Sequence, residues 1–234
     1  MLSENKMSKY LLYALGEIVL VVIGILIALQ INKRHENSQN EQRKIEMLQA
    51  VHHEFELNKD KLALIATEHR KCYANCKELI SLFPIDTEQL DLDTLSTMIR
   101  GTYGNWTFEP LQTRIEFLVG SPDFHFIKDT ELQTVLLSWE SVFEDYQEDE
   151  QRAIDYNFNI LYPYTQKHFS YTQGLSDPRL DISILGSPEF ENTIIRRKFS
   201  IRDIIDSETK ELEVLIATID RIIVLTEPFA KKTP

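Results

Sequence analysis

The stretch LLYALGEIVLVVIGILIALQINK, residues 11–33, decides how the rest of the chain is organised. From Leu11 to Ile31 the only charged side chain is that of Glu17. A helix rises about 1.5 Å per residue, so this run is long enough for a hydrocarbon core about 30 Å thick. A cleaved signal peptide, the alternative, has a shorter apolar run followed by small residues. We expect a transmembrane helix over residues 11–32, retained as a signal anchor after a short flank at residues 1–10.

One face of the expected helix combines a carboxylate with small residues. At about 100° per residue, Gly24 and Ala28 fall about 20° to either side of Glu17, and Tyr13 lies on the same stripe. Small residues let helix backbones approach closely in a membrane, and a carboxyl group can hydrogen-bond across the contact. The pattern predicts an association face. The alternative is a lone anchor whose Glu17 reaches up to the membrane interface.

Positive charges around the span do not decide its orientation, because they occur on both sides. Lys6 and Lys9 precede it, and Lys33 and Arg34 follow it. A long carboxy-terminal domain is translocated largely regardless of such charges. We therefore expect a single-pass membrane protein with its amino terminus inside and its carboxy-terminal domain outside the cytoplasm.

The composition favours an all-α chain and argues against a nucleic-acid partner. The chain has 234 residues, with 25 Lys and Arg against 37 Asp and Glu, so its formal net charge is −12. Such a charge repels nucleic acid. Glycine and proline are scarce, with seven and eight copies, while helix-forming residues are plentiful. One domain of ordinary size fits beside the anchor.

The pattern after the span predicts a helical bundle. Residues 33–44, KRHENSQNEQRK, lack apolar side chains and suit a polar stalk or hinge. Apolar residues then recur at three- and four-residue steps, which indicates long helices near residues 45–83, 128–162 and 203–226. Shorter helices are expected at residues 95–100, 107–119 and 189–198. The predicted fold is therefore all-α, with one N-terminal transmembrane helix, a bundle of long antiparallel helices over residues 45–227, and a tail at residues 228–234.

The pentapeptides GSPDF and GSPEF, residues 120–124 and 186–190, resemble a repeated motif. Helix-boundary chemistry explains them more simply. Glycine ends one element, serine caps the next, proline suits the first helical position, and an acidic residue suits the positive helix end. We interpret both as turns.

A search for catalytic or metal-binding residues finds one candidate cluster. His69, Cys72 and Cys76 share one face of a helix, where soft ligands suit zinc or copper. A fourth ligand is not evident, and free cysteines are often simply small buried residues. The stretch HHEFEL, residues 52–57, lacks the second histidine of a zinc protease helix, and we interpret it as a solvated helix flank. The acidic run at residues 145–150 and the basic run at 196–198 receive the same interpretation.

Other enzyme signatures are missing from the sequence. It contains no nucleophile elbow, phosphate loop or dinucleotide fingerprint. An enzyme is therefore unsupported, and no cofactor is expected.

Residues 8–32, SKYLLYALGEIVLVVIGILIALQIN, resemble the DUF6090 family, single-pass proteins of Bacteroidota whose function is uncharacterised. The Tyr-Ala-x-Gly-Glu start and the Ile-Ala-Leu-Gln-Ile-Asn end occur in order. Residues 110–139 and 187–220 resemble the helical segments of the family more weakly. Family members continue with Asn-Trp-Asn-Glu, whereas this chain has Lys-Arg-His-Glu at residues 33–36 and so lacks an interfacial tryptophan. The resemblance implies no catalytic residue.

These patterns lead to three functional hypotheses. The first is a membrane-anchored helical interaction, sensory or scaffold module that self-associates through its span. The second is a subunit of a larger envelope complex, in which Glu17 pairs with a partner span. The third is a metal-binding envelope protein that uses His69, Cys72 and Cys76. The expected partners are the lipid bilayer and either a second copy or another membrane protein.

Overall fold

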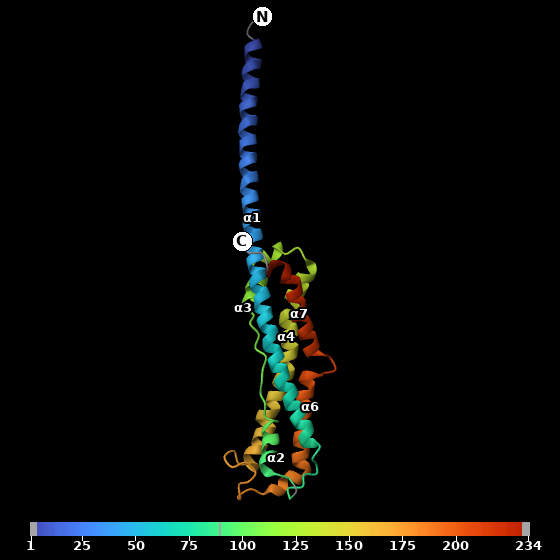
Figure 1. Cartoon of the computed structure of the whole chain (residues 1–234). Helices are drawn as coiled ribbons and strands as arrows, with labels where there is room; N and C mark the ends of the chain where they lie inside the picture. The colour runs from blue at the N-terminus through green and yellow to red at the C-terminus, as the bar shows by residue number, and fades with distance from the viewer. Residues whose placement is uncertain (1–3, 89, 231–234) are drawn as a thin grey trace.

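The computed structural model describes residues 4–88 and 90–230, with side chains from Tyr10 onward (Figure 1). This part of the chain contains helices and no β-strand, so the all-α prediction is confirmed. The α-helices are α1 (Glu4–Ile80), α2 (Leu92–Arg100), α3 (Thr113–Val119), α4 (Thr130–Tyr156), α5 (Tyr162–His168), α6 (Pro188–Ile205) and α7 (Glu211–Ala230). Three shorter elements are the 3-10 helices η1 (Pro122–Phe126) and η3 (Ile182–Gly186) and the π-helix η2 (Asn157–Leu161).

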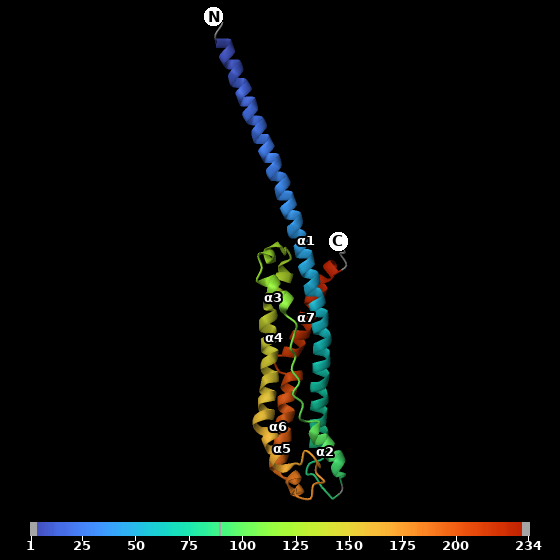
Figure 2. The same ribbon diagram turned by 90° about the vertical axis from the view of Figure 1, so that its left-hand side faces the viewer.

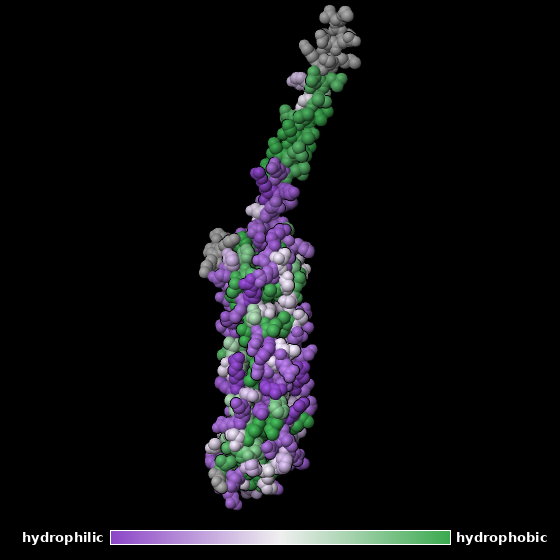
Figure 3. Space-filling view, turned by 90° about the vertical axis from the view of Figure 1, so that its right-hand side faces the viewer, coloured by the Kyte–Doolittle hydropathy of each residue, from purple (hydrophilic) through white to green (hydrophobic). Residues whose placement is uncertain are grey.

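Helix α1 is a single uninterrupted rod of 77 residues. At 1.5 Å per residue it is about 115 Å long. Its first half projects beyond the bundle, and its second half is one wall of the bundle (Figures 1 and 2). Figure 3 shows an apolar surface on the projecting part, followed by a hydrophilic band just before the bundle. The helix continues without a break through residues 33–44, and we call this segment the stalk.

The bundle consists of three long rods. Helix α1 descends, and α4 descends beside it and continues through η2 into α5. Helices α6 and α7 ascend one after the other, with a break at residues 206–210 between them (Figure 2). Helices α1 and α4 each pack along both α6 and α7. The ascending rod is antiparallel to the other two, as the predicted fold class requires.

Buried residues on α1 follow a seven-residue repeat over the bundle. One series is Leu48, Phe55, Leu62, His69 and Cys76, and all five are buried. The second is Val51, Asn58, Ile65, Cys72 and Leu79, of which only Ile65 is half-buried. A seven-residue repeat keeps one face of a long helix turned towards its neighbours. Three of the repeat positions carry polar or sulfur-containing side chains in the lower half of the bundle.

The predicted helix at residues 107–119 is wrong in its first half. Residues 103–112 form an extended segment, and α3 begins only at Thr113. Pro110 lacks an amide hydrogen and disfavours helical backbone at the preceding residue. We call residues 101–112 the strap, because they run up the bundle between α1 and α4 (Figure 2).

Several other helix boundaries differ from the prediction. The predicted helix at residues 203–226 is wrong at its start, because residues 203–205 complete α6 and α7 begins only at Glu211. Helix α1 ends at Ile80, and α4 gives way to a π-helix at Asn157. Helix α7 extends to Ala230, so the first three residues of the predicted tail are helical, and residues 231–234 lie outside the described residues. Both pentapeptides lie at helix boundaries, as interpreted. Ser187 caps α6 by accepting from the Phe190 amide at 3.2 Å, whereas the Ser121 hydroxyl donates to the Leu118 carbonyl.

Candidate functional site

The predicted association face lies on the projecting half of α1. Tyr13, Glu17, Gly24 and Ala28 are all exposed, and a Cβ atom built on Gly24 would meet nothing within 4 Å. By length and composition, α1 is apolar enough to cross a membrane. The four residues therefore form an open stripe on a regular helix, and association through it stays a prediction.

A second polar arrangement, which the sequence did not reveal, holds the strap against α1. The Asn58 side chain donates to the Leu111 carbonyl and accepts from the Leu111 amide, both at 2.7 Å. Lys61 donates to the Glu109 carbonyl at 2.7 Å, and Asn75 donates to the Gly101 carbonyl at 3.1 Å. Side chains of α1 thus replace the backbone partners that an extended segment would find in a sheet.

Glu54 anchors the upper end of the strap. Its buried carboxylate accepts from the backbone amides of Arg114 and Ile115 at 3.0 and 3.1 Å. These amides belong to the first turn of α3, whose own N-cap residue, Gln112, makes no side-chain cap. A carboxylate there satisfies free amides and complements the helix dipole. The interpretation of HHEFEL as a solvated flank is therefore wrong at two positions, since Glu54 is a buried cap and His52 is also buried.

Glu150 of α4 holds the middle of the strap. Its carboxylate is 1% exposed, accepts from the Phe108 amide at 2.9 Å and lies 3.0 Å from His69 Nε2. Tyr146 lies one turn earlier, and burial together with the Glu150 charge raises the pKa of its hydroxyl. The predicted solvated acidic run is therefore wrong at its end, because Asp149 and Glu150 are both buried.

Arg197 of α6 fixes the lower end of the strap from the opposite side. The side chain is fully buried and donates to the backbone carbonyls of Thr102, Gly104 and Ala153. Within the described chain it forms no ion pair, so carbonyl dipoles surround its charge. The predicted solvated basic run is therefore wrong at this position.

Cys72 and Cys76 are free, fully buried thiols beside Arg197. Cys72 donates to the Thr102 carbonyl at 3.5 Å, and the Arg197 guanidinium lies 3.9 Å from its sulfur. The Cys76 thiol as hydrogen-bond donor and the nearby Arg197 charge lower the pKa of Cys72. The pKa of Cys76 is raised, because its thiol donates a hydrogen bond to Cys72 and because it is buried.

The structure gives the metal hypothesis no geometric support. His69 points its Nε2 atom at Glu150, whereas the two thiols lie with Arg197 and the strap. Over residues 4–88 and 90–230, no three His, Cys, Asp or Glu side chains are placed to hold a metal ion together. The metal site stays a prediction from spacing alone.

The arrangement as a whole is a polar layer that positions the strap. Its members come from all three rods, and they present buried hydrogen-bonding groups to strap backbone rather than an exposed nucleophile or base. Sequence reasoning missed Glu54, Asn58, Glu150 and Arg197. The available signal was their position, because each lies among apolar residues that recur at helical spacing.

The comparison with protein families identifies the first half of the chain. Residues 17–112 match DUF6090, a family of unknown function. The resemblance to this family is thereby confirmed over these residues. The DUF6090 match begins at Glu17 and ends at Gln112, so it covers most of α1, all of α2 and the strap. Neither the curated proteins nor the solved structures gave a match.

Proposed function

We propose that this protein is a single-pass, membrane-anchored scaffold that self-associates through α1. The observation that carries the proposal is the continuity of α1 from the apolar span into the bundle core. A continuous helix fixes the orientation of the bundle relative to the span. Pairing of two spans would therefore bring two bundles together at a defined spacing.

The surface of α1 supports this assignment. Residues 10–39 are exposed, so no part of the bundle covers the apolar segment (Figure 3). Large apolar side chains in water are costly at about 25 cal/mol per Å², and a bilayer removes that cost. On the proposed orientation the bundle stands in the periplasm of a bacterial inner membrane, above a stalk of about 20 Å.

Self-association is tested by Gly24→Leu and Ala28→Leu in the full chain, with a membrane reporter of helix pairing. Leucine at either position separates the two backbones, so we expect the association constant to fall at least about five-fold, equivalent to about 1 kcal/mol. Gly16→Leu is the matched control. Gly16 is equally open but lies about 100° away on the helix, so this variant should keep the wild-type signal. An unchanged signal in the Gly24 and Ala28 variants would show that these residues do not form the interface.

Glu17 favours a second candidate, a subunit of a larger envelope complex. A carboxylate inside an apolar span finds a basic or polar group in another span when a partner is present. Purification of the full chain from native membranes distinguishes the two candidates. Recovery of a stoichiometric second membrane protein that Glu17→Leu releases supports the complex, and recovery of this chain alone supports the scaffold.

A further inference from the structure

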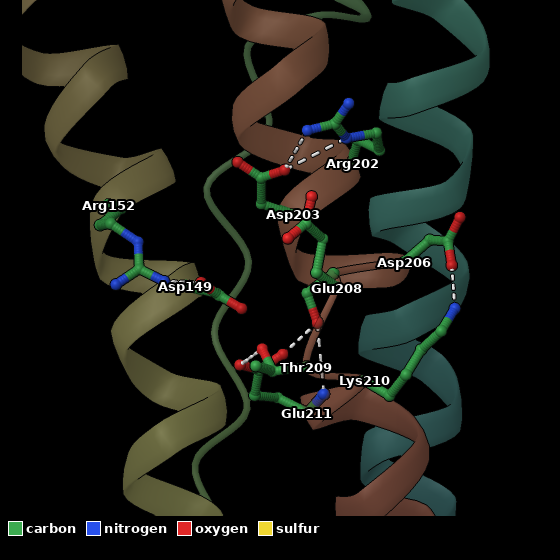
Figure 4. Close-up of a pocket in the computed structure, with 10 residues that line it drawn as sticks. Asp149, Arg152, Arg202, Asp203, Asp206, Glu208, Thr209, Lys210 and Glu211 are labelled. Carbon is green, nitrogen blue, oxygen red and sulfur yellow. Dashed lines mark hydrogen bonds and ion pairs between the residues drawn. The ribbon is translucent and has the colours of Figure 1, made fainter.

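A cavity of about 590 Å³ lies on the side of the bundle where α6 and α7 meet (Figure 4). Its walls come from α4 on one side and from the end of α6, the turn at residues 206–210 and the start of α7 on the other. Of the ten residues that line it, five carry a carboxylate and three carry a basic group. The cavity lies outside both the span and the strap, so a ligand bound there does not require self-association of the chain.

Basic side chains pair with three of the five carboxylates. Asp203 pairs with Arg202 at 2.8 Å, and Asp206 pairs with Lys210. Figure 4 shows the Asp206–Lys210 pair directed away from α4, towards α1. The third base, Arg152, is shared between Asp149 and Glu148. The basic groups are therefore already engaged.

Asp149 is the unusual member of the set. Its side chain is only 2% exposed, and in Figure 4 it points from α4 into the cavity. Arg152 donates to Oδ1, but Oδ2 is buried without a hydrogen-bond partner in the described structure. Buried carboxylate oxygens are nearly always satisfied, so this oxygen marks a position for a donor from outside the chain.

Two further carboxylates lie across the cavity from Asp149. Glu211 accepts from the hydroxyls of Ser207 and Thr209, which hold it in place, and it forms no ion pair within 4 Å among the described residues. Glu208 forms no ion pair within 4 Å among the residues that the structure describes. Glu208 and Glu211 therefore leave negative charge that no ion pair in the described structure neutralises, and they face the unsatisfied Oδ2 of Asp149.

We propose that this cavity binds a linear organic polyamine. One ammonium group donates to Asp149 Oδ2, and the amines further along the molecule lie near Glu208 and Glu211. An ammonium supplies up to three hydrogen-bond donors, and charges spaced along a chain suit carboxylates on separate walls. A single metal ion does not suit the site, because no three acidic, His or Cys side chains converge within the described residues.

The test is calorimetric titration of the full chain in nanodiscs with spermidine at 150 mM salt. We expect saturable one-to-one binding that weakens at least ten-fold in Asp149→Asn, which keeps the side-chain shape and removes its charge. Asp145→Asn is the matched control, since it removes the same charge from an exposed position one turn earlier on α4 and outside the cavity. It should bind as the wild type does.

Three outcomes would overturn the proposal. These are no saturable binding by the wild type, equal weakening in both variants, and equally effective displacement of spermidine by Mg²⁺ at the same total charge. The last two would indicate general attraction to an acidic surface. If Asp149→Asn lowers the melting temperature, the same titration is made with Glu211→Gln, because Glu211 lies on the other wall of the cavity. Unchanged binding in that variant would then count against the site.

Discussion

At the scale of single residues, Arg197 shows how a charged side chain serves as a structural centre. It belongs to the run Arg196, Arg197 and Lys198, whose members look equivalent in the sequence. On α6, however, Arg197 is the charged member of a buried stripe that is otherwise mostly apolar: Phe190, Thr193, Ile194, Ile201 and Ile204. Helical spacing could therefore have singled out Arg197. Its three carbonyl partners could not be predicted, since two of them lie in the strap.

Arg197→Leu should destabilise the bundle strongly. Leucine removes three hydrogen bonds that a charged side chain donates to backbone carbonyl groups, and each hydrogen bond of this kind contributes about 1.5–3 kcal/mol. We expect the free energy of unfolding to fall by at least about 3 kcal/mol in urea titrations followed by tryptophan fluorescence. Arg196→Leu, at an exposed neighbouring position, should stay within about 0.5 kcal/mol of the wild type. Equal stability of the two variants would contradict the assigned role.

At the scale of elements, the strap takes the place of a fourth rod. Apolar spacing predicted the long helices α1, α4 and α7 in their order, because burial of one helix face imposes that spacing. It predicted only residues 189–198 of α6 and assigned the end of that helix to α7. It also predicted a helix at residues 107–112, where side chains from other elements hold the backbone extended. Pro110 was a local signal against a helix. The hydrogen bonds from Asn58 and Glu150 to the strap backbone, however, form only after the rods have assembled.

Asn58→Leu should release the upper part of the strap. The substitution removes two hydrogen bonds of 2.7 Å and leaves the Leu111 amide and carbonyl facing an apolar side chain. We expect a loss of about 2–4 kcal/mol in unfolding free energy and faster amide exchange over residues 105–112. Exchange rates in α6 should change less than those in the strap.

Asn192→Leu makes the same chemical change at an exposed position on α6 and serves as the control. It should leave strap exchange unchanged. If both variants exchange at the wild-type rate, the Asn58 bonds do not hold the strap.

At the scale of the whole molecule, α1 determines how far and in which direction the bundle stands from the apolar segment at residues 11–31. Sequence spacing predicted the span and the bundle separately but did not decide between stalk and hinge for residues 33–44, because polar residues suit both. The structure continues the helix through them. Side-chain hydrogen bonds one turn apart, such as Asn32 to Glu36 and Gln42 to Glu46, support the exposed helix.

Spin labels can measure this rigidity. His35 and Asp60 lie about 37 Å apart along α1 at 1.5 Å per residue. We expect cysteine labels at these positions to give one narrow distance near this value in the full chain, diluted with unlabelled protein. The native thiols are fully buried and should not take up label in the folded chain.

Asn37→Pro should broaden that distance distribution, because proline interrupts a helix interior. Asn37→Ala should leave it narrow. The melting temperature of the bundle should be the same in both variants, since Asn37 is exposed on the stalk. A broad distribution in the wild type would show that the stalk bends.

The position of Arg197 also sets an order of events during synthesis of the chain. The strap emerges from the ribosome soon after α1, yet its lower end is fixed by a side chain 95 residues later than Thr102. Contacts so distant in sequence form late and slowly. Until α6 has been made, the nascent chain exposes an unpaired strap and the apolar face of α1. The strap therefore packs fully only after the last fifth of the polypeptide has been made. Truncation before α6 leaves the strap accessible to proteases and chaperones.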